Sequence, residues 1–374
     1  MIMKNRISEL ATKQLFTNCI VKDNSISSTY KINLFEKYLK LLLEDKVTDL
    51  HFSIQNNFGI ISYRYNTMLI EYEKLPLEDY NKIITKIQIL SGIDIINDRD
   101  PADGSFTFYD NRFRVSMIRD FEGINCVIRK LKTISDLKNL NYSNIFLNYV
   151  EKILNMNHGL ILFSGPTGSG KTTALAYLLI NILKKEPKKI ITIENPIEYK
   201  IPKIEQIEIN NDSKKTSIIK NILRHDPDII MTGEIRTKEI ADITIESAMT
   251  GHLVLSTIHA NNVFGVIERL KKMGIMEYDI LNTVKVIFNQ RFVKILCDCY
   301  KDKNNKGCEK CRYTGYINIT PIFEILEINE HSKKQIKNND IISDEYYYNP
   351  LEEIKQLYIK GKISDSDYKS LLMG

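Results

Sequence analysis

The chain has 374 residues, of which 43% are hydrophobic and 26% are charged. This composition excludes a largely disordered chain, and the length suggests two or three domains. The formal net charge of +5 is small for this length, so the charge gives no reason to expect nucleic acid as the main partner.

The first part of the sequence predicts a polar arm followed by a small α+β domain. Residues 1–32 are rich in Ser, Asn and Lys and are predicted to form the arm. Beyond them, helical spacing and strand-like alternation follow each other over residues 33–131, and residues 132–142 resemble a linker. The predicted helices lie near 34–42 and 79–90, the strands at 49–54, 59–65, 106–109, 112–118 and 127–131, and a turn at 100–104.

From Phe146 onward, buried strands alternate with segments of helical length. The predicted strands are Leu160–Ser164, Lys189–Ile193, Asp228–Thr232 and His252–Thr257. Such alternation predicts an α/β domain with a mainly parallel sheet over residues 143–374. Its last part is predicted to be a loop with four cysteines, followed by short helices.

The strongest motif is Gly165-Pro-Thr-Gly-Ser-Gly-Lys-Thr172, which fits the P-loop pattern between an apolar strand and an apolar helix. Backbone N–H groups and the helix N-terminus would bind phosphate oxygens. Lys171 would bridge the β- and γ-phosphates of ATP, and Thr172 would hold Mg²⁺. The predicted nucleotide-binding residues are Gly165, Pro166, Thr167, Gly168, Ser169, Gly170, Lys171, Thr172 and Thr173.

Hydrolysis also needs a carboxylate that orients or deprotonates water. Glu234 ends an apolar strand at the position expected for that base, while Glu194 and Glu198 follow another buried strand. Because strand ends in an open α/β sheet converge on one crevice, these three residues are candidate catalytic carboxylates. The competing interpretation of each is a solvated loop residue.

Two histidines flank the strand 253–257. His259 and His252 would each act as a sensor of the γ-phosphate if they lie beside the nucleotide. The alternative is that they are structural histidines of a buried strand.

Four motifs in this order resemble the secretion ATPase superfamily of type II secretion and type IV pilus motors. They span residues 165–173, 190–198, 226–234 and 251–261. Gly233 replaces the aspartate usual in Walker B motifs, as is normal in this family, and Asn195 stands where an aspartate is usual. The resemblance implies a RecA-like ATPase domain after a smaller PAS-like α+β domain, with ATP and Mg²⁺ as cofactors.

The N-terminal part resembles the second N-terminal domain of this family, on the segments 49–51, 99–104 and 112–116. The resemblance implies that Arg114 faces the nucleotide, with Arg129 as a second candidate. A guanidinium would neutralise the charge that develops on the transferred phosphoryl group. The alternative for Arg114 is a surface ion pair.

Cys297, Cys299, Cys308 and Cys311 are predicted to bind zinc, because four thiolates satisfy tetrahedral Zn²⁺ and the second pair has C-x-x-C spacing. The first pair is one residue shorter. Reduced thiols without metal and a disulfide are the alternatives, the latter being disfavoured in a cytosol. In the family, assembly and type II secretion motors carry such a cluster and retraction motors generally lack it.

The resemblance implies a homohexamer that hydrolyses MgATP and moves a polytopic membrane platform protein to assemble a pilus or pseudopilus. The short segment before the matching region favours the short motors of Gram-positive competence pili, which serve DNA uptake. A secretion or retraction motor, a RecA-like nucleic-acid translocase and a non-hydrolysing scaffold are alternatives. The paired lysines near 184, 188 and 214 are predicted to be solvated, without direct nucleic-acid binding. The sequence has no membrane-spanning run and no secretory signal, so we expect a cytoplasmic protein at the membrane periphery.

Overall fold

A computed structural model describes residues 35–44, 47–65, 68–94, 101–109, 111–132, 137, 140–209, 214–302 and 307–373. The chain divides into two compact units, Met1–Lys130 and Leu131–Gly374. The arm predicted over residues 1–32 lies outside the described residues. Among the described residues, no helix is long and apolar enough to cross a membrane.

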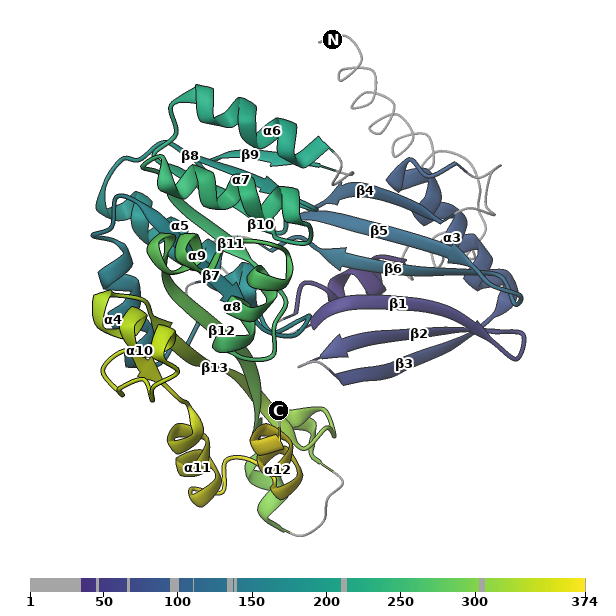
Figure 1. Cartoon of the computed structure of the whole chain (residues 1–374). Helices are drawn as coiled ribbons and strands as arrows, with labels where there is room; N and C mark the ends of the chain where they lie inside the picture. The colour runs from purple at the N-terminus through teal and green to yellow at the C-terminus, as the bar shows by residue number, and fades with distance from the viewer. Residues whose placement is uncertain are drawn as a thin grey trace. The chain divides into compact units, whose positions relative to one another are not determined.

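The first unit contains an antiparallel sheet of six strands in the order β3-β2-β1-β6-β5-β4 (Figure 1). The strands are β1 Val47–Gln55, β2 Phe58–Tyr65, β3 Met68–Pro76, β4 Ala102–Phe108, β5 Asn111–Arg119 and β6 Ile124–Lys130. A helix at residues 35–41 and α3 Leu77–Ser91 accompany the sheet. The predicted α+β character of this unit is confirmed.

One face of this sheet forms the core of the unit. Leu50, Val115 and Ile128 are fully buried there and pack with Tyr38 and Tyr80 from the helices. Because successive side chains of a strand point to opposite faces, the residues next to these three in sequence lie on the other face, which is polar.

Two sequence predictions for this unit differ from the structure. The turn predicted over residues 100–104 is already strand from Ala102, which pairs with Met117 of β5. Strand β3 was not predicted, because it lies at the edge of the sheet and carries charged side chains, Glu71, Glu73 and Lys74, among its apolar ones.

The second unit contains an eight-stranded sheet in the order β14-β13-β12-β7-β11-β10-β8-β9. The six strands from β12 to β9 in this order are parallel. Strand β13 pairs antiparallel with β12, and β14 pairs antiparallel with β13. The strands are β7 Gly159–Ser164, β8 Ile190–Glu194, β9 Glu205–Glu208, β10 Ile229–Glu234, β11 Leu253–Thr257, β12 Val284–Leu296, β13 Tyr316–Glu327 and β14 Tyr347–Tyr348. The predicted mainly parallel sheet is confirmed.

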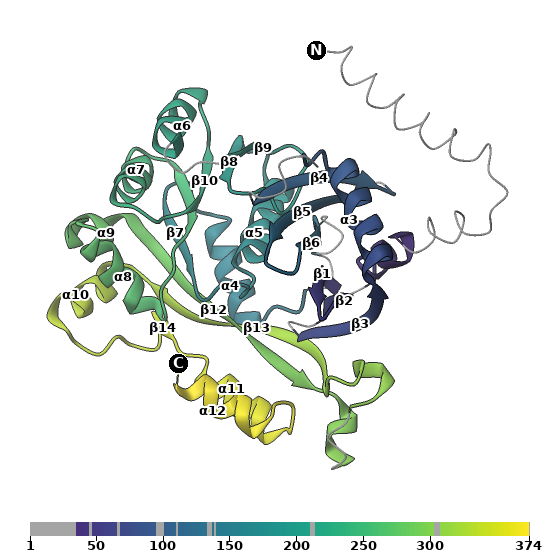
Figure 2. The same cartoon turned by 90° about the vertical axis from the view of Figure 1, so that its right-hand side faces the viewer.

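Helices cover both faces of this sheet (Figure 2). Alternate side chains of β7 point to opposite faces of the sheet. Ile161 and Phe163 pack with α4 and α5 on one face, whereas Leu160 and Leu162 pack with α7, α8 and α9 on the other. The helices are α4 Asn144–Ile153, α5 Lys171–Lys185, α6 Lys215–Ile222, α7 Lys238–Met249, α8 Val263–Lys272, α9 Glu277–Thr283, α10 Glu330–Asn338, α11 Leu351–Ile359 and α12 Asp365–Met373. A β-strand buried on both faces has no polar alternation, which explains the continuous apolar runs in the sequence.

The long hairpin of β12 and β13 was not predicted. A loop and short helices were expected after the strand that ends at Thr257. In the structure, Val286 to Leu296 pair with the residues from Glu327 to Tyr316. The hairpin extends away from the parallel strands and carries the cysteines at its end, beside α11 and α12 (Figure 1). The polar positions of β12 do not follow a regular alternation, so no clear strand pattern was visible there in the sequence.

The segment 132–142, expected as a linker, belongs to the second unit where it is described. Lys132 forms a β-bridge with Tyr199, and Leu137 is buried in the core beside α4 and α5.

Candidate functional site

The P-loop lies at the carboxyl end of β7, between that strand and α5. The parallel neighbours β11 and β10 end at the same edge, so His259 and Glu234 reach it from positions far away in the sequence. This is the edge at which ligands bind in open α/β sheets. The structure therefore brings together three of the predicted site elements.

The P-loop glycines are required by close packing against β12. Gly165 has φ +130°, and a Cβ there would come within 2.2 Å of the Gln290 carbonyl oxygen. Gly170 precedes α5 with φ +87°, and its Cβ would come within 2.6 Å of the Phe292 ring. Only glycine allows this combination of conformation and contact, so β12 fixes the path of the loop.

Lys171 lies over the loop that precedes it. Its Nζ donates to the carbonyl oxygens of Gly165 at 2.8 Å and Pro166 at 2.9 Å. Burial lowers the pKa of this ammonium group, while the negative charges of Glu234 and Glu198 act in the opposite direction. The ammonium therefore lies at the P-loop, with both carboxylates close enough to influence it.

Glu234 lies between two basic side chains. Arg236 Nη2 is 2.9 Å from one carboxylate oxygen, and His259 Nε2 is 3.3 Å from the other. The other ring nitrogen of His259, Nδ1, is 3.2 Å from the Gly165 carbonyl and must donate to it, because a carbonyl oxygen only accepts. His259 thus connects the P-loop backbone to the Glu234 carboxylate.

Glu194 and Glu198 lie in the connection after β8. The Glu194 carboxylate is buried and accepts hydrogen bonds from Thr192 Oγ1 at 2.6 Å and Gln206 Nε2 at 2.9 Å. Burial raises the pKa of Glu194, and these two hydrogen bonds only partly offset it. A buried carboxyl whose oxygen is already hydrogen-bonded by neighbouring side chains suits a structural role better than a metal ligand.

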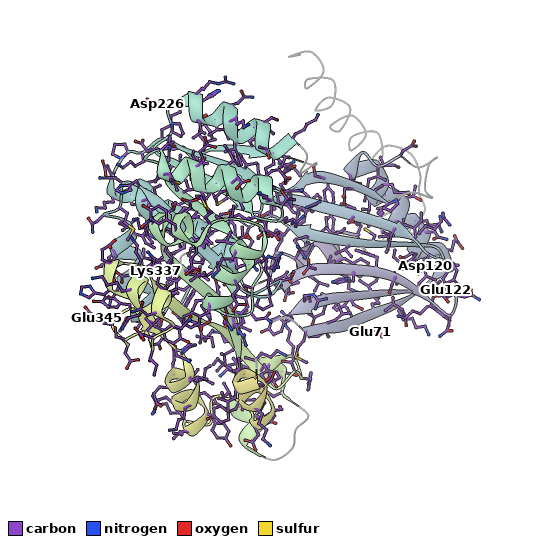
Figure 3. All side chains as sticks on the ribbon, viewed as in Figure 1. Glu71, Asp120, Glu122, Asp226, Lys337 and Glu345 are labelled. Atoms are coloured by element: carbon purple, nitrogen blue, oxygen red, sulfur yellow. The ribbon has the colours of Figure 1, made fainter. Side chains whose placement is uncertain are left out.

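His252 is not brought to this edge of the sheet. It directly precedes β11, and its main-chain oxygen accepts from Gly159 N at the start of β7, whereas the P-loop follows the end of that strand. Asp226, just before β10, marks the same amino-end side in Figure 3. His252 Nδ1 contacts the Ser247 carbonyl at 3.0 Å. Within one chain His252 thus lies away from the P-loop, and a γ-phosphate sensor at His252 stays a prediction.

Arg114 belongs to a row of charged residues across the polar face of the first unit's sheet. Arg114 pairs with Arg129, Arg129 with Asp49, and Asp49 with Arg64. Directly opposite residues share a face, so Arg64 and Arg129 flank the Asp49 carboxylate and Arg114 lies beyond Arg129. Arg129 Nε lies 2.5 Å from the buried Asp49 carboxylate, and Arg64 Nε lies 3.8 Å from it. Arg114 is 37% exposed and lies 3.7 Å from the exposed Asp103.

The four cysteines at the end of the β12–β13 hairpin form one cluster whose sulfur atoms all lie within 4.8 Å of one another. The Cys297–Cys308, Cys299–Cys311 and Cys308–Cys311 sulfur distances are 3.8, 3.7 and 3.9 Å. Four ligands at the usual Zn–S distance of about 2.3 Å place tetrahedral sulfur atoms about 3.8 Å apart. These distances are too long for a disulfide, so that alternative does not hold for the described cysteines.

Backbone groups also favour thiolates in this cluster. The N–H groups of Cys308 and Gly315 donate to Cys311 Sγ at 3.2 and 3.3 Å. Burial alone would raise the pKa of the Cys311 thiol, but these donors and the neighbouring thiols lower it to about 7. The donor set thus fits a divalent metal that binds thiolate sulfur.

Some residues of the site were not identified from the sequence. Arg236 was not singled out, although its position two residues after Glu234 is a usable signal. Gln290, whose carbonyl packs against the P-loop, lies on the strand that the sequence analysis missed. Tyr199, whose hydroxyl lies 2.9 Å from Thr173 Oγ1, has no signature of its own.

A glycine-rich loop between a buried strand and a helix, with a carboxylate ending a neighbouring strand, defines the second unit as a RecA-like P-loop nucleotide-binding fold. The family profile described as type II/IV secretion system protein matches residues 25–364. The chain belongs to this family of secretion ATPases.

Relatives and solved structures agree with this assignment. Type II secretion system protein E of Pectobacterium carotovorum subsp. carotovorum is 30% identical over 338 residues, covering 83% of this chain and 68% of that protein. The type IV pilus assembly ATPase PilB of Thermus thermophilus is 30% identical over 338 residues, covering 80% and 38%.

Among solved structures, the ATPase DotB of Legionella pneumophila has a TM-score of 0.69 at 19% identity, covering 91% of this chain and 95% of that one. The pilus retraction motor PilT with bound ADP has a TM-score of 0.66 at 23% identity, covering 89% and 95%. At these identities the likeness concerns the fold.

Proposed function

We propose that this chain hydrolyses MgATP and uses the energy to drive assembly of a type IV-like pilus or pseudopilus. The observation that carries the hydrolysis is the connection from the Gly165 carbonyl through His259 to the Glu234 carboxylate. It places a carboxylate and a histidine at the edge where the P-loop would hold the phosphates.

In this proposal the P-loop N–H groups and Lys171 bind the phosphates, and Thr172 holds Mg²⁺. When bound, Mg²⁺ would neutralise part of the negative charge on the phosphates. Glu234 orients or deprotonates the attacking water, and His259 detects the γ-phosphate. Glu198 adds negative charge near Lys171. Glu194 stays a predicted site residue, although its burial favours a structural role.

Arg114, and Arg129 beside it, would complete the site in a homohexameric ring, where a guanidinium stabilises the transition state. The ring would act on a polytopic membrane platform protein at the cytoplasmic face of the membrane. Family resemblance supports these proposals, and a competence pilus that takes up DNA is the first candidate system. Type II secretion is the second candidate, because several relatives carry that name.

The test of the proposed activity is phosphate release from MgATP by the purified chain over a dilution series. Because rings form by mass action, turnover per subunit should rise with protein concentration, in step with light scattering. DNA at moderate salt should leave the rate unchanged. Absence of turnover by the assembled protein would contradict the proposal, and strong stimulation by DNA would instead support a nucleic-acid translocase.

We also propose that Cys297, Cys299, Cys308 and Cys311 hold one structural Zn²⁺. The sulfur geometry and the N–H donors to Cys311 support this proposal. Such an ion would link the two ends of the hairpin and stabilise its fold locally. This cluster also favours an assembly or secretion motor over a retraction motor.

A further inference from the structure

Lys215 is buried where a lysine is unfavourable. It is only 4% exposed and is the first residue of α6. A cation at a helix N-terminus opposes the helix dipole, and burying an ammonium group requires hydrogen-bonding partners. Residues that break a local rule in this way often belong to functional sites.

The Lys215 ammonium reaches the catalytic strand. Its Nζ donates to the main-chain oxygen of Glu234 at 2.6 Å. This bond holds the peptide group that follows the Glu234 Cα, and the Ile235 N–H of the same peptide group donates to the Thr257 carbonyl at 2.8 Å. The peptide group is therefore held from both sides.

The peptide group that precedes the Glu234 Cα is held as well. The Gly233 carbonyl accepts from Ser256 Oγ and Thr257 Oγ1, both at 3.1 Å. These bonds are needed because Gly233 has φ +66° and the pairing of β10 with β11 is irregular between Met231 and Glu234. Regular ladder bonds do not fix the backbone at this bend, so side-chain donors take their place.

We propose that Lys215 is a positioning residue for hydrolysis, which fixes the backbone of Glu234 so that its carboxylate faces His259 and the P-loop. The inference rests on the proposed ATPase function. In this proposal Lys215 acts through the Glu234 main chain rather than on the substrate or the reacting atoms. A carboxylate displaced by about 1 Å loses much of its efficiency as a base, whereas the P-loop keeps its affinity for nucleotide.

The test is steady-state ATP hydrolysis by Lys215→Met, which keeps the aliphatic stem and removes the donor. We expect kcat to fall roughly 10- to 100-fold, while KM and the affinity for MgADP change by less than about 3-fold. Lys215→Arg, which restores a cationic donor, should recover part of the rate. Lys220→Met, on the exposed face of the same helix, is the matched control and should match wild type.

A double variant distinguishes positioning from a general structural role. If Lys215 acts through Glu234, then Lys215→Met should lower the residual rate of Glu234→Gln by less than 2-fold, because the two losses are not additive. Additive losses, or a Lys215→Met kcat equal to wild type, would overturn the inference. Should Lys215→Met fail to bind MgADP, Lys215→Gln carries the same test with the same two outcomes. A wild-type chain without turnover would instead remove the proposed function.

Discussion

The two units of this chain place their charged residues on sheets of opposite construction. In the second unit, parallel strands end at one edge, so His259 meets the Gly165 carbonyl although 94 positions separate them. In the first unit, antiparallel strands place Arg64, Arg114 and Arg129 across one face, because these residues lie in one row of the register.

The difference lies in what holds the side chains. At the parallel edge, main-chain carbonyls of the P-loop and of Gly233 fix the site, and these are shielded by the fold. On the antiparallel face, ion pairs orient the arginines, and the pair of Arg114 with Asp103 is open to solvent. The parallel edge is thus preorganised by the backbone, whereas Arg114 is oriented by a weak ion pair that is open to solvent.

The largest effect is expected at the edge where the parallel strands of the second unit end. Glu234→Gln removes the base but leaves the P-loop intact, so MgATP binding should persist while turnover falls by roughly 10²–10⁴-fold. Lys171→Ala should weaken nucleotide binding itself. Phosphate release and fluorescent-nucleotide titration measure the two effects. Near-normal turnover by Glu234→Gln would remove this carboxylate from the chemistry.

The second prediction concerns the arginine row on the polar face of the first unit's antiparallel sheet. Arg114→Ala should lower kcat by roughly 10²-fold with little change in nucleotide affinity, because the guanidinium matters most as charge moves in the transition state. Lysine should be a poor replacement, since it lacks the planar fork. Asp103→Ala, which removes the exposed partner, is the control and should leave the rate close to wild type. Equal rates for Arg114→Ala and wild type would exclude the arginine.

The third prediction concerns the hairpin end, which belongs to neither the edge nor the face. Cys308→Ser should reduce bound zinc from about one equivalent per chain to well below half, and lower the melting temperature by several degrees. Metal analysis of protein purified without chelator, with calorimetry, measures both. Wild-type protein without zinc, and with four freely titratable thiols, would disprove the metal site.

The smallest effect is expected from the burial of the Glu194 carboxyl. Burial raises the pKa of Glu194 in the folded chain, so its contribution to stability is complete below the unfolded pKa of about 4.3 and is lost as pH rises through the folded pKa. Glutamine does not ionise, so Glu194→Gln does not lose this contribution to folding stability. The variant should be as stable as wild type or more stable at pH 7 to 8. Denaturant unfolding at several pH values should show the difference vanishing toward pH 4. A less stable variant at pH 8 would mean that the charge itself is required.

Much of the parallel edge could be predicted from the sequence, because a buried strand, a glycine-rich turn and a helix leave a periodic pattern. The same pattern located Glu234 and His259, which follow strand ends. The position of His252 could not be predicted, because a histidine next to a strand does not reveal at which end of the sheet it lies. Only the register of β11 with β7 decides this.

The antiparallel regions were harder to predict. Arg64 was missed because its place in the arginine row depends on the pairing of β1 with β2, and the sequence does not specify register. Strand β12 was missed because its polar positions, among them Gln290, pack against the P-loop rather than follow an amphipathic alternation. Lys215, expected among the solvated lysines, is buried, because its ammonium donates to a main-chain oxygen, a contact that leaves no pattern in the sequence.

Strand β12 is common to the P-loop and the cysteine cluster. Gln290 packs behind Gly165, and Leu296 precedes Cys297 on the same strand. An extended strand rises about 3.3 Å per residue and resists stretching, so the six steps between Gln290 and Leu296 set a spacing of about 20 Å. The strand therefore keeps the P-loop and the cysteine cluster at a fixed distance from each other. Spectroscopic labels near Gln290 and Leu296 should keep the same distance in every nucleotide state. Such a pair of labels would be an internal standard for measuring displacements elsewhere in the chain.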